Sequence, residues 1–173
     1  MRPARLDDRS GDSKLDRYKI EYRVVLERVG GLSTSSWDNS VSGLSNNAAD
    51  LLNDLRTVAA NLNFDVAKHC GARGFSWSGS DVKTFEYWDS IEGATRALFE
   101  VRAFKNGNLH IRFAQEFVMR LNLEFGRLKG WIKSPREAAE ELDIPFDVAV
   151  AGFEVNHKLE NLSALRLGFQ PDA

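Results

Sequence analysis

The chain contains a single cysteine, Cys70, among its 173 residues. One thiol excludes a disulfide within the chain and a metal site built from cysteines, and it favours a reducing compartment. Apolar runs are short as well, because none approaches the roughly 18 consecutive residues that a membrane-spanning helix needs. The charged first residues lack the apolar core of a signal peptide. We therefore expect a cytoplasmic protein that does not contact the membrane.

Neither sign of charge is in large excess. The formal net charge is −2 at pH 7, and the isoelectric point is near 6.0. A protein that coats nucleic acid over its whole surface needs a strongly positive field, and a phosphate-mimicking inhibitor needs a strongly negative one. The composition excludes both classes, so any contact with a polyanion must use a local patch.

The motifs that mark common catalytic sites are also missing. The sequence has no GxxxxGK[ST] phosphate loop, no GxGxxG after a strand, and no HExxH, GxSxG or CxxC. The three histidines, His69, His110 and His157, are widely spaced, and nothing in the sequence joins them in one site. The sequence therefore identifies no catalytic residue, no cofactor and no metal ligand.

What the chain does have is the composition of one globular domain, with 43% hydrophobic and 28% charged residues. The polar residues 1–13 are expected to form a flexible N-terminus. Residues 14–173 are expected to form a single α+β domain. In it, a small antiparallel sheet that includes a 98–113 hairpin packs against three to four helices.

Three segments carry the periodicity or the capping residues of helices. Residues 48–62 place one apolar stripe at helical spacing, with Asn47 as the expected N-cap. Residues 115–128 show a similar stripe. Ser134-Pro135-Arg136-Glu137 is a capping box that predicts a short helix ending near residue 142.

The first half of the chain is harder to assign. Within residues 14–29, two overlapping sets of apolar side chains support different structures. Helical spacing is shown by Leu15, Tyr18, Tyr22, Val25 and Val29, and strand alternation by Ile20, Tyr22, Val24 and Leu26. We favour the helix, because Gly30-Gly31 is a typical helix stop. Residues 30–46 predict a long loop in which Trp37 anchors on the core. Short strands are expected at 75–77 and 85–87.

The 98–113 hairpin is the most informative segment. Two alternating runs flank Lys105-Asn106-Gly107-Asn108, and Asn-Gly between such runs is the strongest local hairpin signal. A two-residue turn would mix polar and apolar side chains on both faces. A three-residue loop at 106–108 gives one clean apolar face, so we expect Ala103 opposite Ile111 and Arg102 opposite Arg112.

Two arginines side by side repel each other unless a counter-charge is near. That charge can be Glu100 on the same face, an acidic residue of a neighbouring element, or an external phosphate or carboxylate. The outward face and tip of the hairpin are thus the candidate anion-binding or nucleic-acid-binding site, with the residues Arg102, Lys105, Asn106, Asn108, His110 and Arg112.

The stretch from Trp88 to Leu142 resembles a family. Its motif FEVRAFKNGNLHIRF, followed by LN and GRLKGW, is similar to a domain-of-unknown-function family of phage and plasmid proteins. Members of that family are often fused to S-adenosylmethionine-dependent DNA adenine methyltransferases. The resemblance implies a mobile-element origin and a nucleic-acid setting. It does not imply methylation, because this chain lacks a [DN]PP[YF] motif and a glycine-rich cofactor loop.

The leading hypothesis is a non-catalytic binding module from a mobile genetic element that acts on DNA or on a nucleic-acid-handling complex. Antagonism of a host defence system, of the anti-CRISPR or anti-restriction type, is one role within it. The alternative is an enzyme acting on nucleotides or nucleic acid, with its site on the outward hairpin face. A third hypothesis is a self-associating structural module.

Overall fold

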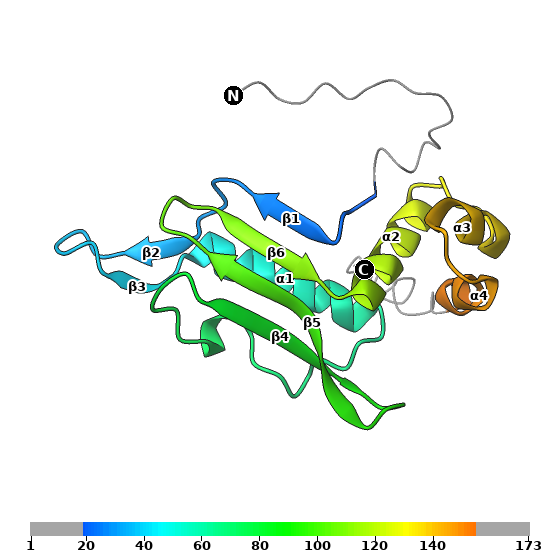
Figure 1. Cartoon of the computed structure of the whole chain (residues 1–173), viewed down its shortest axis with the longest axis horizontal. Coiled ribbons are helices and arrows are strands. Elements are labelled where there is room, and N and C mark those ends of the chain that lie inside the picture. The colour runs from blue at the N-terminus through cyan, green and yellow to red at the C-terminus, as the bar shows by residue number, and fades with distance from the viewer. Residues whose placement is uncertain (1–18, 155–173) are drawn as a thin grey trace, which may run out of the picture.

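The computed structural model of the protein describes residues 19–154 and places them in a four-stranded antiparallel sheet with helices packed against it (Figure 1). The α+β class is confirmed, with four α-helices in this range. The flexible N-terminus expected at 1–13 lies outside the described residues. The elements are β1 (Arg23–Leu26), β2 (Leu32–Thr34), β3 (Val41–Leu44), α1 (Asn46–Asn61), the 3-10 helix η1 (Ala72–Gly74), β4 (Val82–Asp89), β5 (Ala94–Ala103), β6 (Leu109–Phe113), α2 (Gln115–Leu128), α3 (Pro135–Leu142) and α4 (Phe146–Glu154).

The sheet has the order β1-β6-β5-β4, and each neighbouring pair is antiparallel. α1 lies behind it in Figure 1 and shares one hydrophobic core with the inward side chains of the strands. At the centre of that core, the ring of Phe99 stacks on Phe85 with centroids 4.6 Å apart and on Phe117 of α2 at 6.1 Å. The opposite face of the sheet is the face that carries exposed polar side chains.

A second, smaller core joins α2, α3 and α4 through Leu123, Ile132, Ala138, Leu142 and Ala149. The capping residues expected for α3 are confirmed. Ser134 Oγ accepts a hydrogen bond from Glu137 N at 3.2 Å, and Pro135 is the first helical residue. α2 contributes to both cores, so it connects the sheet to the C-terminal helices.

Residues 23–26 form a strand, so the helix favoured at 14–29 is wrong where the structure describes that segment. β1 pairs with β6, with Val24 opposite Ile111 and Leu26 opposite Leu109. The edge of β6 supplies backbone partners for a short extended segment, and the alternating set places Val24 and Leu26 against the core. Tertiary pairing therefore decided between two patterns that the sequence fitted equally.

The long loop predicted at 30–46 is also wrong. β2 and β3 form a separate two-stranded antiparallel sheet, which projects from one end of the molecule (Figure 1). Its contact with the core is made by Leu32, Val41 and Leu44. Trp37 lies in the connecting turn with 97% of its surface exposed, so the prediction that it anchors on the core is wrong too.

Of the two strands expected between 75 and 87, only the second exists. The expected 85–87 strand is part of β4, which pairs with β5. Residues 75–77 follow η1 instead and pack irregularly. Phe75 lies against Phe85 at 4.9 Å between centroids, and Trp77 Nε1 donates to Ala72 O at 2.8 Å. The aromatic residues there fill the core, as the sequence indicated, without extended pairing.

The 98–113 hairpin is confirmed together with its apolar face, but its register lies two residues from the predicted one. Val101 pairs with Ile111 and Ala103 with Leu109. All four side chains are buried, at 2% exposure or less. Because side chains alternate with a period of two, a shift of two residues keeps each side chain on its face and changes only its partner.

The register shift follows from the position of a glycine. Phe104 N donates to Asn108 O at 3.0 Å, and Gly107 N donates to Phe104 O at 3.2 Å, so the three-residue loop is 105–107 rather than 106–108. The last residue of such a loop takes a left-handed conformation, and Gly107 has a φ of +87°. A loop at 106–108 would place that conformation on Asn108 instead.

The segment between β1 and β2 packs tightly on the hairpin tip. Gly30 N donates to Gly107 O at 3.2 Å, and Leu32 N donates to Phe104 O at 3.0 Å. Gly31 lies between them with a φ of +45°, and a Cβ at this position would meet the carbonyl oxygen of Phe104. This contact is where the N-terminal segment meets the β5–β6 turn.

The N-terminus of α1 is held against the same segment, at Gly31. Ser45 N donates to Gly31 O at 3.0 Å, and Ser45 Oγ accepts from Ala48 N at 3.3 Å. Ser45 is therefore the N-cap of α1, and the prediction of Asn47 as the cap is wrong. The serine is preferred because one residue satisfies both the helix end and the loop.

We expect Gly31→Ala to lower the free energy of unfolding by about 2 kcal/mol or more, because alanine is strained at positive φ and its methyl group collides with backbone. Gly79→Ala is the control, since a Cβ there has nothing within 4 Å and its φ is not positive. It should change stability by less than about 0.5 kcal/mol. Urea unfolding measures both, and equal stability of the two variants would contradict the packing described.

Candidate functional site: the open face of the sheet

The outward face of the sheet gathers charged side chains from three neighbouring strands. Alternation along β5 and β6 directs Glu100, Arg102, His110 and Arg112 to this face, and β1 adds Arg23. Together with Val25 and Val82 these side chains line a shallow hollow of about 350 Å³. Three of the six hairpin residues predicted from sequence, Arg102, His110 and Arg112, thus line a wider surface.

Arg112 has a counter-charge of its own. Glu100 is its cross-strand partner, and Arg112 Nη2 lies 2.6 Å from Glu100 Oε2. The hydrogen bond and the charge of Glu100, and secondarily Tyr22, raise the pKa of Arg112 above its usual value. The inference that Arg102 and Arg112 meet side by side is therefore wrong, and Arg112 is neutralised by the first of the counter-charges considered.

Arg102 is in a different position. Its cross-strand neighbours are His110 on β6 and Val82 on β4. Its side chain is exposed, and among residues 19–154 it forms no ion pair and no hydrogen bond. Arg102 therefore presents an unpaired guanidinium group to solvent beside the hollow.

Two arginines do oppose each other on this face, but the second is Arg23. Its Cα partner is Arg112, and its guanidinium lies 5.8 Å from the ring centroid of Tyr22 without an acidic partner in the described part of the chain. Sequence reasoning missed Arg23 because its segment was assigned to a helix. The alternation of Ile20, Tyr22 and their neighbours was the signal that could have found it.

The tip residues predicted for the site hold loops together. Lys105 Nζ donates to Asn39 O at 2.7 Å, and Asn108 Oδ1 accepts from Arg28 N at 3.1 Å. Asn106 Oδ1 accepts from Asn108 N at 3.1 Å within the turn. These polar groups have partners in the chain, and a binding role for them remains a prediction.

His110 is exposed and tilted against Phe104, with ring centroids 4.5 Å apart. Of the four charged residues that line the hollow, three are arginines and one is a glutamate, so the face carries a formal charge of +2 with His110 neutral. The whole chain has a charge of −2. The positive charge is therefore local, which is what a weakly acidic protein needs to bind a polyanion.

A family model described as a domain of unknown function, DUF4942, matches residues 14–131, which is more than half of the chain. The chain belongs to the DUF4942 family. The match starts well before the 88–142 stretch that carries the resemblance in the sequence, and it includes every residue that lines the hollow. No curated protein and no solved structure matches the chain.

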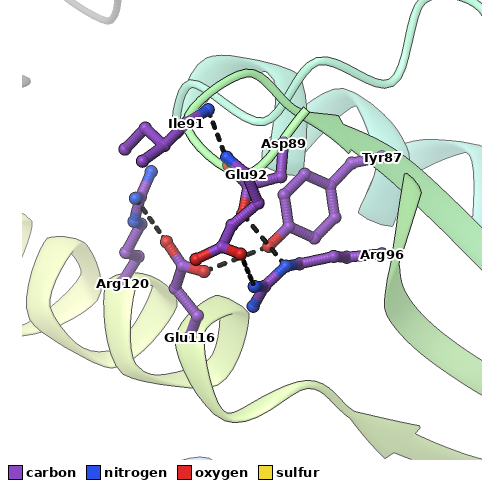
Figure 2. A network of polar contacts seen from close by, with 7 residues as sticks. All are labelled: Tyr87, Asp89, Ile91, Glu92, Arg96, Glu116 and Arg120. Atoms are coloured by element: carbon purple, nitrogen blue, oxygen red, sulfur yellow. Dashed lines mark hydrogen bonds and ion pairs between the residues drawn. The ribbon is translucent and has the colours of Figure 1, made fainter. Parts of the chain in front are cut away.

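A second polar cluster in this DUF4942 chain lies where β4 meets α2 (Figure 2). Tyr87 Oη donates to Glu116 Oε2 at 3.0 Å, and Arg120 Nη2 donates to Glu116 Oε1 at 2.6 Å. Arg120 also donates to Leu62 O at 3.1 Å and lies over the ring of Phe64 at 4.6 Å. Both carboxylate oxygens of Glu116 are thus occupied.

The remainder of that cluster closes the β4–β5 turn. Arg96 Nε lies 3.0 Å from Asp89 Oδ2 and its Nη2 lies 3.4 Å from Glu92 Oε2, while Asp89 Oδ1 accepts from Ile91 N at 3.0 Å (Figure 2). Every charged group drawn there has a partner within the chain. The cluster therefore fastens the sheet to α2.

Residues 19–154 of the DUF4942 chain lack two further features that would point to a function. No three His, Cys, Asp or Glu side chains in this range are grouped so that they could hold a metal ion. No helix in the same range has the length and hydrophobicity to cross a membrane.

The phenol of Tyr87 should report on the cluster. Burial, followed by the charge and hydrogen bond of Glu116, raises its pKa from 10.0 to about 12. The folded state holds this proton more tightly than the unfolded state, so the associated stability is complete below pH 10 and is lost as the pH rises towards 12. We expect Tyr87→Phe to cost about 1 kcal/mol at neutral pH and to flatten that loss.

The free energy of unfolding, measured at several pH values between neutrality and 12 for both proteins, tests this. The ultraviolet absorbance of ionised tyrosine gives the pKa directly. An unchanged pH dependence in Tyr87→Phe would mean that the cluster does not hold the phenol as described.

Proposed function

We propose that this DUF4942 chain is a non-catalytic module that binds nucleic acid through the open face of its sheet. The observation that carries the proposal is Arg102, an exposed guanidinium group beside a hollow with no counter-charge among the described residues. Arg23 adds a second such group on the same face. Guanidinium groups hold phosphate with two parallel hydrogen bonds, so a phosphate backbone is the ligand that this face fits best.

The shape and lining of the face support the same ligand. Val25 and Val82, 54% and 47% exposed, flank the arginines on the two edge strands. Exposed apolar groups between cations suit a chain molecule in which sugars and bases alternate with phosphates. The hollow is shallow and open, as a surface for a long ligand requires.

The same contacts disfavour the enzyme alternative. Glu100 is committed to Arg112, and His110 has no carboxylate partner among the described residues that would orient its ring for proton transfer. A general base must reach the proton that it removes, at about 3 Å. Binding without turnover is the simpler use of this face.

The biological setting is part of the proposal and is supported by the resemblance to phage and plasmid proteins. Those related proteins are often fused to DNA adenine methyltransferases. A protein encoded by such a mobile genetic element would act close to DNA in the cytoplasm. The role that fits a non-catalytic binder there is to occupy DNA, or a complex that handles it, in competition with a host defence system.

Replacing both unpaired arginines should weaken binding. We expect the double variant Arg23→Ala and Arg102→Ala to lose at least about tenfold in affinity for DNA at low salt. The slope of log affinity against log salt should fall by about 0.7 to 0.9 for each phosphate that is no longer neutralised. Fluorescence anisotropy over a range of salt concentrations measures both quantities.

The matched control is the double variant Arg73→Ala and Arg136→Ala, which also removes two positive charges. Arg73 pairs with Asp50 of α1 at 3.1 Å and Arg136 with Glu140 of α3 at 3.1 Å, and neither lines the hollow. This control should leave affinity and slope near the wild-type values. If the double variant binds like the wild type, or if the control loses as much, the open face is not the binding surface.

Removing the competing carboxylate should strengthen binding. Glu100→Gln takes one negative charge from the face and frees Arg112, so we expect several-fold higher affinity and a salt slope steeper by about 0.7 to 0.9. The pair is partly exposed, so its loss should cost little stability.

Glu140→Gln provides the same change of charge on α3, where Glu140 pairs with Arg136 at 3.1 Å and does not line the hollow. Its affinity should stay near that of the wild type. A gain in both variants would indicate a general charge effect, and a gain in neither would count against phosphate binding by Arg112.

A further inference from the structure

Trp37 is the most exposed large hydrophobic residue of the described chain, at 97%. It lies in the turn between β2 and β3, on the hairpin that projects from the end of the molecule (Figure 1). Its ring makes no aromatic or cation contact with another residue in 19–154. A side chain in this position contributes almost nothing to the folded state, so its indole ring is free to meet a ligand.

The turn that carries the indole is held by a dense set of hydrogen bonds. Ser35 N donates to Ser40 O at 2.9 Å, Asn39 N donates to Ser35 O at 3.1 Å, and Trp37 N donates to Ser35 Oγ at 3.3 Å. Ser40 donates to Asp38 Oδ1 through both N and Oγ, and these bonds lower the pKa of Asp38. The backbone is thus fixed before any ligand arrives, which reduces the entropy lost on binding.

The turn is also joined to the cationic face. Lys105 Nζ donates to Asn39 O at 2.7 Å, so the β2–β3 turn is fastened to the tip of the β5–β6 hairpin. Arg102 lies three residues before Lys105, so at most about 11 Å of chain separates the two. A ligand a few nucleotides long could therefore reach from the arginines to the indole.

An exposed indole beside a cationic face distinguishes between forms of nucleic acid. Aromatic side chains bind bases by stacking on their flat faces, largely without regard to sequence. In a duplex these faces are covered by the neighbouring base pairs, whereas in a single strand they are accessible. We propose that Trp37 is a stacking platform for an unpaired base, and that the nucleic acid bound by the arginine face is single-stranded. This inference rests on the proposed function.

The test compares oligothymidylate and oligouridylate of about 12 nucleotides with a duplex of the same length. We expect the wild type to bind one or both single strands more tightly than the duplex. Trp37→Ala should weaken single-strand binding about tenfold, and Trp37→Phe should weaken it less, because phenylalanine keeps an aromatic face. The salt slope should not change, because every phosphate keeps its cationic partner.

Ile91→Ala is the matched control, since Ile91 is 94% exposed in the turn between β4 and β5. Neither this variant nor Trp37→Ala should change the unfolding temperature, which separates a binding defect from misfolding. The two single-strand arms differ in the 2′-hydroxyl group of the sugar and in the C5 methyl group of the base, and preference for either one over the duplex supports the inference.

The outcomes also separate this inference from the proposed function. Undiminished binding by Trp37→Ala, or equal affinity for duplex and single strand, would overturn the stacking role of Trp37. Loss of binding in the double arginine variant would still support the proposed cationic binding face. If the wild type bound none of the three probes, both proposals would fall.

Discussion

The pairing of β5 with β6 is the interaction on which the other features of this DUF4942 chain depend. It places Phe99, Val101, Ile111 and Phe113 against the core and, by the same alternation, sends Glu100 and Arg112 to the open face. A slip of one residue would exchange the two sets and bury the charges. Gly107 at the turn, with the segment around Gly31 packed on it, keeps that register. The stability of the core and the chemistry of the face therefore follow from one constraint.

The register also determines which cation is available to a ligand. It sets Arg112 against Glu100 and Arg102 against His110, so one guanidinium group is neutralised and another is left free. β1 then brings Arg23 to the far side of Arg112. A carboxylate within such a face competes with any external anion for the guanidinium group that it contacts.

Stability and surface chemistry are separated in this fold. The stacked rings around Phe99, and the Tyr87–Glu116–Arg120 cluster that joins β4 to α2, lie among buried or partly buried groups. Arg23, Arg102 and Trp37 are exposed, and among the described residues only Arg23 of these three lies against a ring, that of Tyr22. Exposed residues of this kind can be replaced at little cost to folding, because little surface becomes buried around them. Their presence is accordingly not required for stability.

The sequence by itself determined the class of the fold, three of the helices and the faces of the 98–113 hairpin, because periodicity and capping residues are local properties of the chain. It could not determine which residues lie opposite each other on neighbouring strands. A shift of two residues leaves the hydrophobic pattern unchanged but replaces Arg102 by Glu100 as the neighbour of Arg112. Likewise, the pattern at 20–26 fitted both a helix and a strand until the edge of β6 supplied hydrogen bonds, and only then did Arg23 join the face. Tertiary structure decided these points because cross-strand contacts depend on residues far apart in the chain.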